Sequence, residues 1–183
     1  IVKKRDQLLT KNFFNKKNNI FISFGYFDQM NLSLKAINEL LSKTNYNIIV
    51  IVSSEAEIYK QLYLKYRLHN RVKIFNYIQD ISSIYLDSVT SLGTFGLMSL
   101  ERAYLAVPQV NILEELNQKN NMIALTNHKF AISFDNIFEL FTSSTNTFLF
   151  PDKSLYQYLA SKSKNLFGDG VLEWVRLIDI ISS

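Results

Sequence analysis

The sequence predicts an α/β domain with a Rossmann-like, doubly wound parallel sheet. Short runs rich in β-branched and aromatic residues alternate along the chain with longer stretches of helical periodicity. The short runs are mostly apolar, as expected of parallel strands that are buried on both faces. With 183 residues, 48% of them hydrophobic, the chain can bury one substantial core, and we expect one domain over residues 1–183.

Each expected element follows from this alternation. The run Asn47-Ile-Ile-Val-Ile-Val52 is typical of the strands, which are expected over residues 19–24, 47–52, 72–75, 88–92, 109–113 and 130–134. Helices are expected over residues 31–42, 55–66, 80–86, 97–105, 118–125, 136–143, 153–165 and 171–181. Asp28 or Asn31 suits the N-cap of the first helix, and Ser54 with Glu57 forms a capping box at the second. The Ser-, Thr- and Asn-rich stretch 142–147 is interpreted as a loop.

Composition and charge narrow the classes of partner. The formal net charge is +4, but Lys and Arg are scattered and no aromatic and basic stripe follows them, so we expect no nucleic-acid partner. The chain has no cysteine, which excludes disulfides, thiolate metal sites and cysteine nucleophiles and fits a reducing, cytoplasmic location. No apolar run is long enough to cross a bilayer, and the first residues lack a signal-peptide core.

Complete catalytic constellations are missing from the sequence. Zinc-ligand spacing, the Gly-x-x-x-x-Gly-Lys phosphate loop, Gly-x-Gly-x-x-Gly and Gly-x-Ser-x-Gly are all absent. His69 and His128 lie far apart beside basic residues, and we expect both at the surface. We therefore assign no catalytic residue, no metal and no cofactor. Because the first residue is Ile rather than Met, we expect the chain to be part of a longer protein.

The stretch from Ser91 to Pro108 is the strongest candidate for a ligand site. It contains a strand end, a glycine-containing turn, a short helix carrying Glu101, and the proline that opens the next strand. This arrangement brings free amides of a helix N-terminus to the carboxyl ends of strands, where phosphate binds and a carboxylate can meet a ribose. The stretch therefore indicates a nucleotide site. The alternatives are structural: Gly25 relieves a turn, and Arg102 points outward as a solvated charge.

Four segments in order carry a resemblance to a known family: Ile22-Ser-Phe-Gly25-Tyr-Phe-Asp28-Gln-Met-Asn31, Asn76-Tyr-Ile-Gln-Asp80, Gly96-Leu-Met-Ser99-Leu-Glu101-Arg102 with Val107-Pro108, and Gly168-Asp-Gly170. They are similar to segments in the C-terminal half of GT-B-fold nucleotide-sugar proteins. Among these the chain most resembles the UDP-sugar hydrolase of pseudaminic acid biosynthesis and its relatives in spore-coat and surface polysaccharide pathways, and more distantly MurG-like glycosyltransferases. The resemblance runs from about residue 21 to residue 181.

The resemblance implies a nucleotide-binding set made of Gly25, Tyr26, Asp28, Ser53, Tyr77, Ile78, Gly96, Leu97, Met98, Ser99 and Glu101. The amides after Gly25, the helix N-terminus at residues 96–98 and the Ser99 side chain would hold the diphosphate without a metal. The backbone around Ile78 would contact uracil, and Glu101 would accept hydrogen bonds from the ribose. The implied partners are UDP or a UDP-sugar and an N-terminal GT-B half, which would supply the catalytic base.

Several residues depart from the family pattern. Tyr26 and Phe95 stand where the family has glycines, and Leu97 and Met98 replace a Ser-Thr pair that supplies hydroxyl donors. We therefore expect weakened nucleotide binding. The leading hypothesis is the UDP-sugar-binding domain of a hydrolase in polysaccharide or nonulosonate biosynthesis, inactive in isolation. The alternatives are the donor half of a glycosyltransferase, a degenerate interaction module without a ligand, and a flavodoxin-like fold of unrelated function.

Overall fold

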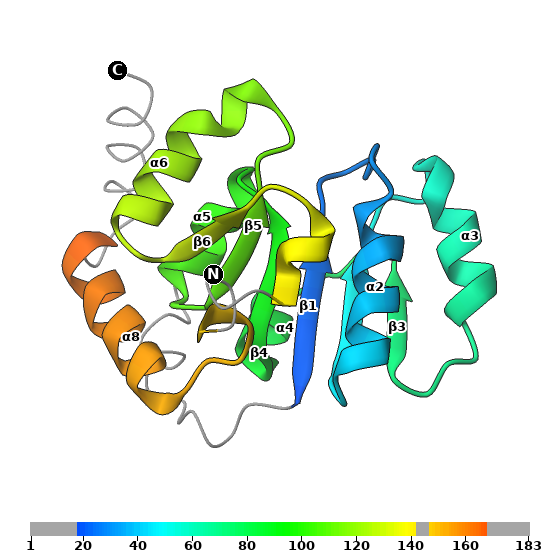
Figure 1. Ribbon diagram of the computed structural model, residues 1–183, viewed down its shortest axis with the longest axis horizontal. Helices are drawn as coiled ribbons and strands as arrows, with labels where there is room; N and C mark the ends of the chain where they lie inside the picture. The colour runs from blue at the N-terminus through cyan, green and yellow to red at the C-terminus, as the bar shows by residue number, and fades with distance from the viewer. Residues whose placement is uncertain (1–17, 142–146, 168–183) are drawn as a thin grey trace.

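A six-stranded parallel sheet forms the centre of the protein. The computed structural model describes residues 18–141 and 147–167. The strands are β1 (Asn19–Ser23), β2 (Asn47–Ile51), β3 (Val72–Phe75), β4 (Ser88–Thr94), β5 (Gln109–Ile112) and β6 (Ala131–Phe134). They lie in the order β3-β2-β1-β4-β5-β6 (Figure 1), which confirms the predicted doubly wound α/β class. The order reverses between β1 and β4, and ligands bind at such switch points in open α/β sheets.

The helices connect these strands as the sequence predicts, with one correction. They are α2 (Leu32–Lys43), α3 (Glu57–Tyr66), α4 (Ile81–Asp87), α5 (Leu97–Tyr104), α6 (Lys119–Asn127) and α8 (Lys153–Phe167), with 3-10 turns η3 (Leu116–Gln118) and η4 (Ile137–Phe141). The helix expected over 136–143 is the short η4, because Glu139 bonds back to the Asp135 amide and the Asn136 side chain and closes a tight turn. The expected helix 171–181 and the Gly168–Gly170 segment lie outside the described residues, as do 142–146 of the expected loop.

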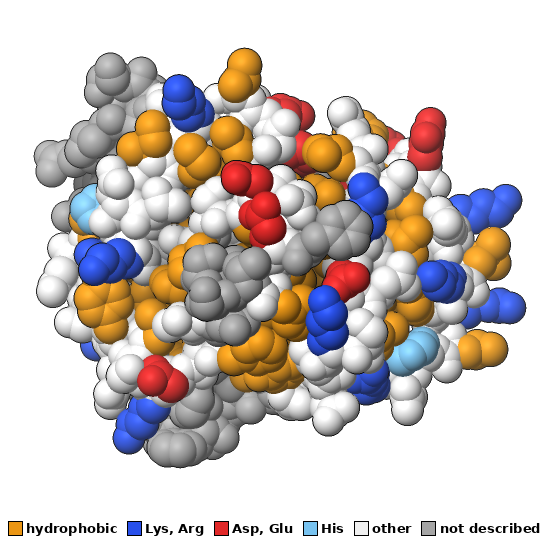
Figure 2. All heavy atoms as spheres, viewed as in Figure 1, with side chains coloured by type: hydrophobic (Ala, Val, Ile, Leu, Met, Phe, Trp, Pro, Cys, Tyr) orange, Lys and Arg blue, Asp and Glu red, His pale blue; other side chains and the backbone are white. Residues whose placement is uncertain are grey.

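Two apolar layers cover the sheet. Alternate residues of β1 face opposite sides: Ile20 and Ile22 pack in one cluster with α2 and α3, whereas Phe21 packs in the other with α4, α5, α6 and α8. Figure 1 shows α2 in front of the sheet and α4 behind it. Burial on both faces explains why apolar residues stand at successive positions of β1 and β2. Figure 2 shows Lys and Arg side chains dispersed among acidic and apolar ones on one face of the molecule.

The start of α2 is fixed by Asp28. Its Oδ1 accepts a hydrogen bond from the Leu32 amide at 2.8 Å and its Oδ2 one from the Ser33 amide at 3.0 Å. Asn31, the other predicted cap, adopts a left-handed conformation with φ 54° and makes no side-chain cap bond. Asp28 therefore occupies the first free amides of the helix with its carboxylate.

The predicted capping box of Ser54 and Glu57 is wrong. The chain turns through the hydrogen bond from the Ala56 amide to the Ser53 carbonyl, so α3 begins at Glu57 with Ala56 at the N-cap position. The Ser53 hydroxyl accepts from the Glu55 amide instead, at 3.1 Å. Within the described residues, no helix has the length and hydropathy needed to span a membrane.

Candidate functional site

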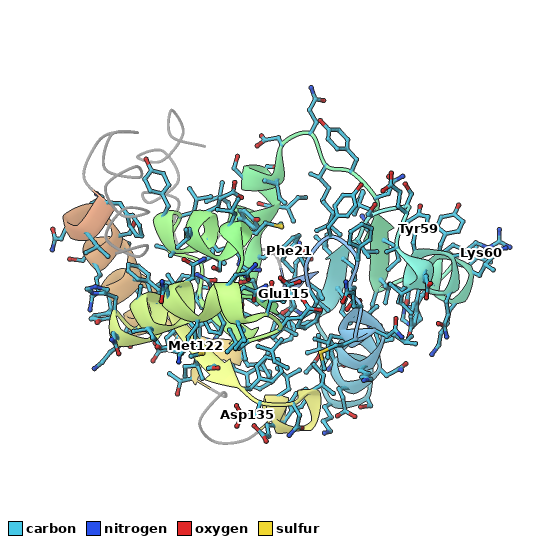
Figure 3. All side chains as sticks on the ribbon, turned by 90° about the horizontal axis from the view of Figure 1, so that it is seen from above. Phe21, Tyr59, Lys60, Glu115, Met122 and Asp135 are labelled. Carbon is cyan, nitrogen blue, oxygen red and sulfur yellow. The ribbon has the colours of Figure 1, made fainter. Side chains whose placement is uncertain are left out.

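A hollow of about 420 Å³ opens at the carboxyl edge of the sheet, beside the switch point between β1 and β4. The residues that line it come from the ends of β1 to β4, the segments that follow them, and α5: Ser23, Gly25, Tyr26, Ile51, Val52, Ser53, Asn76, Tyr77, Ile78, Thr94, Gly96, Leu97, Met98 and Arg102. Figure 3 looks onto this edge of the sheet, with the α3 residues Tyr59 and Lys60 at the right of the view. Parallel sheets bind ligands at this edge.

Most of the predicted nucleotide-binding residues meet in this hollow. They are Gly25, Tyr26, Ser53, Tyr77, Ile78, Gly96, Leu97 and Met98. These residues are separated by up to about seventy positions in the sequence, and the parallel order of the strands brings them to one edge. Asp28, Ser99 and Glu101 are not among the lining residues.

Asp28 and Ser99 have structural partners instead. Both carboxylate oxygens of Asp28 accept amides of α2. The Ser99 side chain is buried, and its hydroxyl donates to the Gly96 carbonyl at 2.6 Å within the first turn of α5. These contacts hold the two helix starts in shape, so the structure supports the capping alternative for Asp28.

Glu101 lies one helical turn beyond Leu97 on the same face of α5. Its Oε2 accepts a hydrogen bond from the hydroxyl of Tyr85 on α4, at 3.4 Å. Burial raises the pKa of Glu101, while the Tyr85 hydrogen bond and the charge of Arg102 oppose that rise. Glu101 is therefore on the same side of α5 as Leu97, which lines the hollow, and one of its oxygens is held by Tyr85.

A further carboxylate, that of Glu114, lies beside Gly25 in the turn after β1. Gly25 has φ +78°, a conformation that residues with a Cβ rarely adopt. A Cβ built there would lie 3.5 Å from Oε2 of Glu114, which follows β5. Burial, with the charges of Asp28 and Glu115, raises the pKa of Glu114. Figure 3 labels Glu115, its neighbour, near the middle of this edge, and the sequence analysis missed Glu114.

The departures from the family pattern have different structural consequences. The Phe95 side chain is buried in the core cluster of α4 and α5, and its backbone is held by Gln118 and Asn121. Phe95 therefore does not occupy the hollow. Tyr26 lies at the rim, where its hydroxyl donates to Glu55 at 3.3 Å. Leu97 and Met98 do line the hollow, so no side-chain hydroxyl is available from these two positions.

Arg102 contradicts the prediction of an outward, solvated charge. Its side chain is 0% exposed and lines the inner end of the hollow. The guanidinium donates from Nε to Oε1 of Gln109 at 3.2 Å and from Nη2 to Oδ1 of Asn111 at 3.1 Å and to the Thr94 carbonyl at 3.2 Å. Nη1 has no hydrogen-bond partner. Burial lowers the pKa of Arg102 to about 10, so the group remains charged at neutral pH.

The sequence contains a signal for this buried cation. Gln109 and Asn111 occupy alternate positions of β5, so both point to one face of a strand that is buried throughout. Two amides on a buried face require a polar partner, because unpaired polar groups are costly to bury. Gly93 supplies the space: a Cβ there would lie 2.7 Å from Nη1 of Arg102.

The other candidate groups do not form sites. Among residues 18–141 and 147–167, no cluster of three or more His, Asp or Glu side chains could hold a metal ion. His128 is exposed as predicted, whereas His69 is half-buried and its Nδ1 accepts the Arg71 amide. A second hollow of about 370 Å³, lined by Asn19, Asn47 and Arg71 among others, lies where β1 and β2 begin. That is the edge opposite the one at which open α/β sheets bind ligands.

Comparison with curated sequences identifies one distant relative. No family model matches the sequence. The uncharacterized protein MJ1062 of Methanocaldococcus jannaschii is 26% identical over 121 residues, which cover 64% of this chain and 25% of that protein. This chain therefore matches about a quarter of the length of that relative.

Solved structures share the fold. The glycotransferase of kitacinnamycin matches with a TM-score of 0.66 at 12% identity, over 94% of this chain and 44% of its own. MurG of Acinetobacter baumannii matches with a TM-score of 0.63 at 14% identity, over 97% and 52% respectively. The S. aureus MnaA-UDP co-structure matches with a TM-score of 0.62 at 12% identity, over 93% and 49%. This chain therefore has the fold of a GT-B glycosyltransferase domain and spans about half the length of these proteins.

Proposed function

We propose that this chain is the donor-binding half of a GT-B protein and binds UDP or a UDP-sugar in the hollow at the carboxyl edge of its sheet. The observation that carries the proposal is the position of that hollow, between the end of β1 and the N-terminus of α5 at the switch point of the sheet. Structures with this fold include ones bound to UDP, such as Arabidopsis thaliana UGT89C1 and S. aureus MnaA.

The N-terminus of α5 suits a diphosphate. Gly96 is its N-cap residue and makes no side-chain cap bond, so the first amides of the helix are not occupied by a side chain of their own cap. Such amides, together with the positive end of the helix dipole, bind phosphate groups without a metal ion. Leu97 and Met98 would therefore contribute backbone donors, although their side chains are apolar.

The opposite wall suits a nucleoside. Tyr77 and Ile78 follow β3 and line the hollow with an apolar surface that a base can contact. Glu101 would accept hydrogen bonds from the ribose, since a carboxylate provides two acceptor oxygens for a vicinal diol. The uracil would then lie beside the end of β3 and the diphosphate at the start of α5, with Glu101 reaching the ribose from the next turn of that helix.

The proposal extends to the reaction that the bound UDP-sugar would undergo. We favour a hydrolase of a UDP-sugar in nonulosonate or polysaccharide biosynthesis, with transfer of the sugar to an acceptor as the second candidate. In both, UDP leaves from the anomeric carbon, and the amides of α5 stabilise the negative charge that develops on it. We assign no catalytic base to this chain, so the base would come from an N-terminal half and the isolated chain is expected to be inactive.

Calorimetric titration of the chain with UDP tests the proposal. Selective binding is expected for UDP over ADP and CMP, and Glu101→Gln is expected to weaken it by about tenfold or more, because a hydrogen bond to a charged group contributes about 1.5–3 kcal/mol. Glu39→Gln on α2 is the matched control, since it removes the same charge from a residue paired with Lys43. It should leave the affinity for UDP unchanged.

The outcomes separate the alternatives. Equal affinity for the three nucleotides would contradict a uridine site. No binding at millimolar UDP would favour the degenerate module, in which case Leu97→Ser with Met98→Thr, which restores the hydroxyl donors, is expected to restore binding. Hydrolase and transferase are then distinguished by assaying a chain that also carries the partner half, with and without an acceptor.

A further inference from the structure

We propose that the buried guanidinium of Arg102 is the receptor for the anionic group of the ligand, a phosphate or diphosphate, in the hollow at the end of β4. The inference deepens the proposed function and rests on it for the identity of the nucleoside, but its chemistry requires only a phosphate anion. Arg102 would be a binding residue, since Nη1 would donate directly to a phosphate oxygen.

The first argument is the incomplete set of partners around Arg102. Its Nε and Nη2 donate to Gln109, Asn111 and the Thr94 carbonyl, all neutral acceptors. Its Nη1 is buried without a partner, and Arg102 lines the hollow. Within the described residues, no carboxylate forms an ion pair with it, although the charge of Glu101 acts on it at longer range. Nε and Nη2 of Arg102 thus make three hydrogen bonds within the protein. Nη1 makes none, and the side chain to which it belongs lines the hollow.

The second argument is that the surrounding residues hold the guanidinium in one position. Asn111 donates to Oε1 of Gln109, and Gln109 donates to the Ser99 carbonyl, so both amide acceptors of Arg102 are themselves oriented. Gly93 leaves room for the guanidinium, because a Cβ at that position would lie 2.7 Å from Nη1 and 3.0 Å from Nη2. The guanidinium is therefore held in one position in the protein without a ligand.

The third argument is energetic. Burial of a cation without a carboxylate partner carries a desolvation penalty that neutral amides offset only in part. A phosphate in the hollow would supply the missing negative charge, and charge-assisted hydrogen bonds between Arg and phosphate are among the strong ones in proteins. The same donor also compensates for the hydroxyls that are missing at Leu97 and Met98.

Inorganic pyrophosphate is the appropriate probe, because it tests the anion receptor without the nucleoside. Thermal unfolding and calorimetry of the full chain should show that pyrophosphate binds and stabilises the protein. Arg102→Met and Asn111→Asp are each expected to weaken the binding of pyrophosphate and UDP at least tenfold and to leave the affinity for uridine unchanged. Asn111→Asp places a carboxylate next to Nη2 and neutralises the cation in place.

Two controls isolate the position of the charge. Arg67→Met removes an exposed arginine at the end of α3, and Asn45→Asp adds a carboxylate in the exposed turn before β2. Both should leave pyrophosphate affinity within twofold of the original protein. Because Asn111→Asp gives the buried cation a carboxylate partner, and an uncompensated buried charge is destabilising, the Asn111→Asp protein without ligand should melt at the same temperature or higher. If Arg102→Met does not fold, Asn111→Asp decides the question.

The possible failures are distinguishable. Binding of pyrophosphate within twofold of the original protein in Asn111→Asp would overturn the role of Arg102. So would a protein that binds uridine and UDP equally well and pyrophosphate not at all, an outcome that leaves the uridine site intact. Conversely, Arg102-dependent binding of pyrophosphate with no preference for UDP over ADP would support the receptor and contradict the proposed nucleotide.

Discussion

Gly93→Ala is expected to destabilise the protein and to displace Arg102. A Cβ at this position would lie 2.4 Å from the Ser23 carbonyl oxygen, 2.7 Å from Nη1 of Arg102 and 3.0 Å from its Nη2. The nearest atom belongs to the backbone of β1, which is paired with β2 and β4 and cannot move freely. Overpacking of this kind costs typically about 1–3 kcal/mol. Replacement of glycine also reduces the conformational entropy of the unfolded chain, which offsets about 0.4–1 kcal/mol of this loss of stability.

The difference of the two ranges is a net loss of about 0–2.6 kcal/mol, and the clash with a backbone atom favours its upper half, about 1–2.5 kcal/mol. This corresponds to a melting temperature lower by about 2–10 °C for a domain of this size. Urea unfolding and calorimetric melting measure both quantities. Gly96→Ala is the matched control, because the nearest atom to its Cβ would be Oγ1 of Thr94 at 3.7 Å and its φ of −73° suits alanine. It should change stability by less than about 0.5 kcal/mol. Equal stability of the two variants would refute the packing of the guanidinium against Gly93.

Three further substitutions test the edge of the sheet. Asp28→Ala removes both acceptors for the first amides of α2 and should lower the free energy of unfolding by about 1–2 kcal/mol. Asn31→Ala should have a smaller effect, because Asn31 makes no side-chain cap bond. Urea unfolding measures both variants, and a larger loss for Asn31→Ala would contradict the assignment of Asp28 as the cap. Gly25→Ala imposes a Cβ on φ +78° and should cost about 1–2 kcal/mol in the same assay, a result that a neutral variant would exclude. Because the folded-state pKa of Glu114 is raised, its ionised form costs stability at neutral pH and the cost disappears as pH falls through that pKa. Glu114→Gln should therefore stabilise the protein at pH 7 and have no effect below about pH 4, and unfolding curves with a pH-independent difference would contradict the assignment.

The fold was predictable because the apolar pattern of parallel strands is simple. The run Asn47-Ile-Ile-Val-Ile-Val52 contains β2, which is buried on both faces, and the other strands lie within two residues of their expected bounds. The exact starts of helices were less predictable. Ser54 and Glu57 have the spacing of a capping box, but the turn through Ser53 delays the helix, and spacing alone contains no information about that turn.

The candidate site was predicted in outline rather than in detail. Tyr77 and Ile78 were expected in it from the family resemblance, and the structure places them in the same hollow as the first turn of α5. The orientation of Arg102 was missed, because its helix neighbours in sequence do not reveal that the side chain runs beneath β4 and reaches β5. That contact depends on Gln109 and Asn111, residues that become neighbours of Arg102 only when β5 pairs with β4.

The buried arginine also bears on whether the chain lost its ligand. Leu97 and Met98 remove hydroxyl donors from the start of α5, which taken alone favours a degenerate module. A module without an anion, however, would carry the desolvation penalty of Arg102 with a buried Nη1 and only neutral partners to offset it. A site that binds phosphate through backbone amides and one guanidinium accounts for both observations, because the cation replaces the hydroxyl donors and the ligand supplies the counter-charge. The buried Arg102 therefore favours the proposed phosphate-binding site, with altered contacts, over an inert copy of the fold.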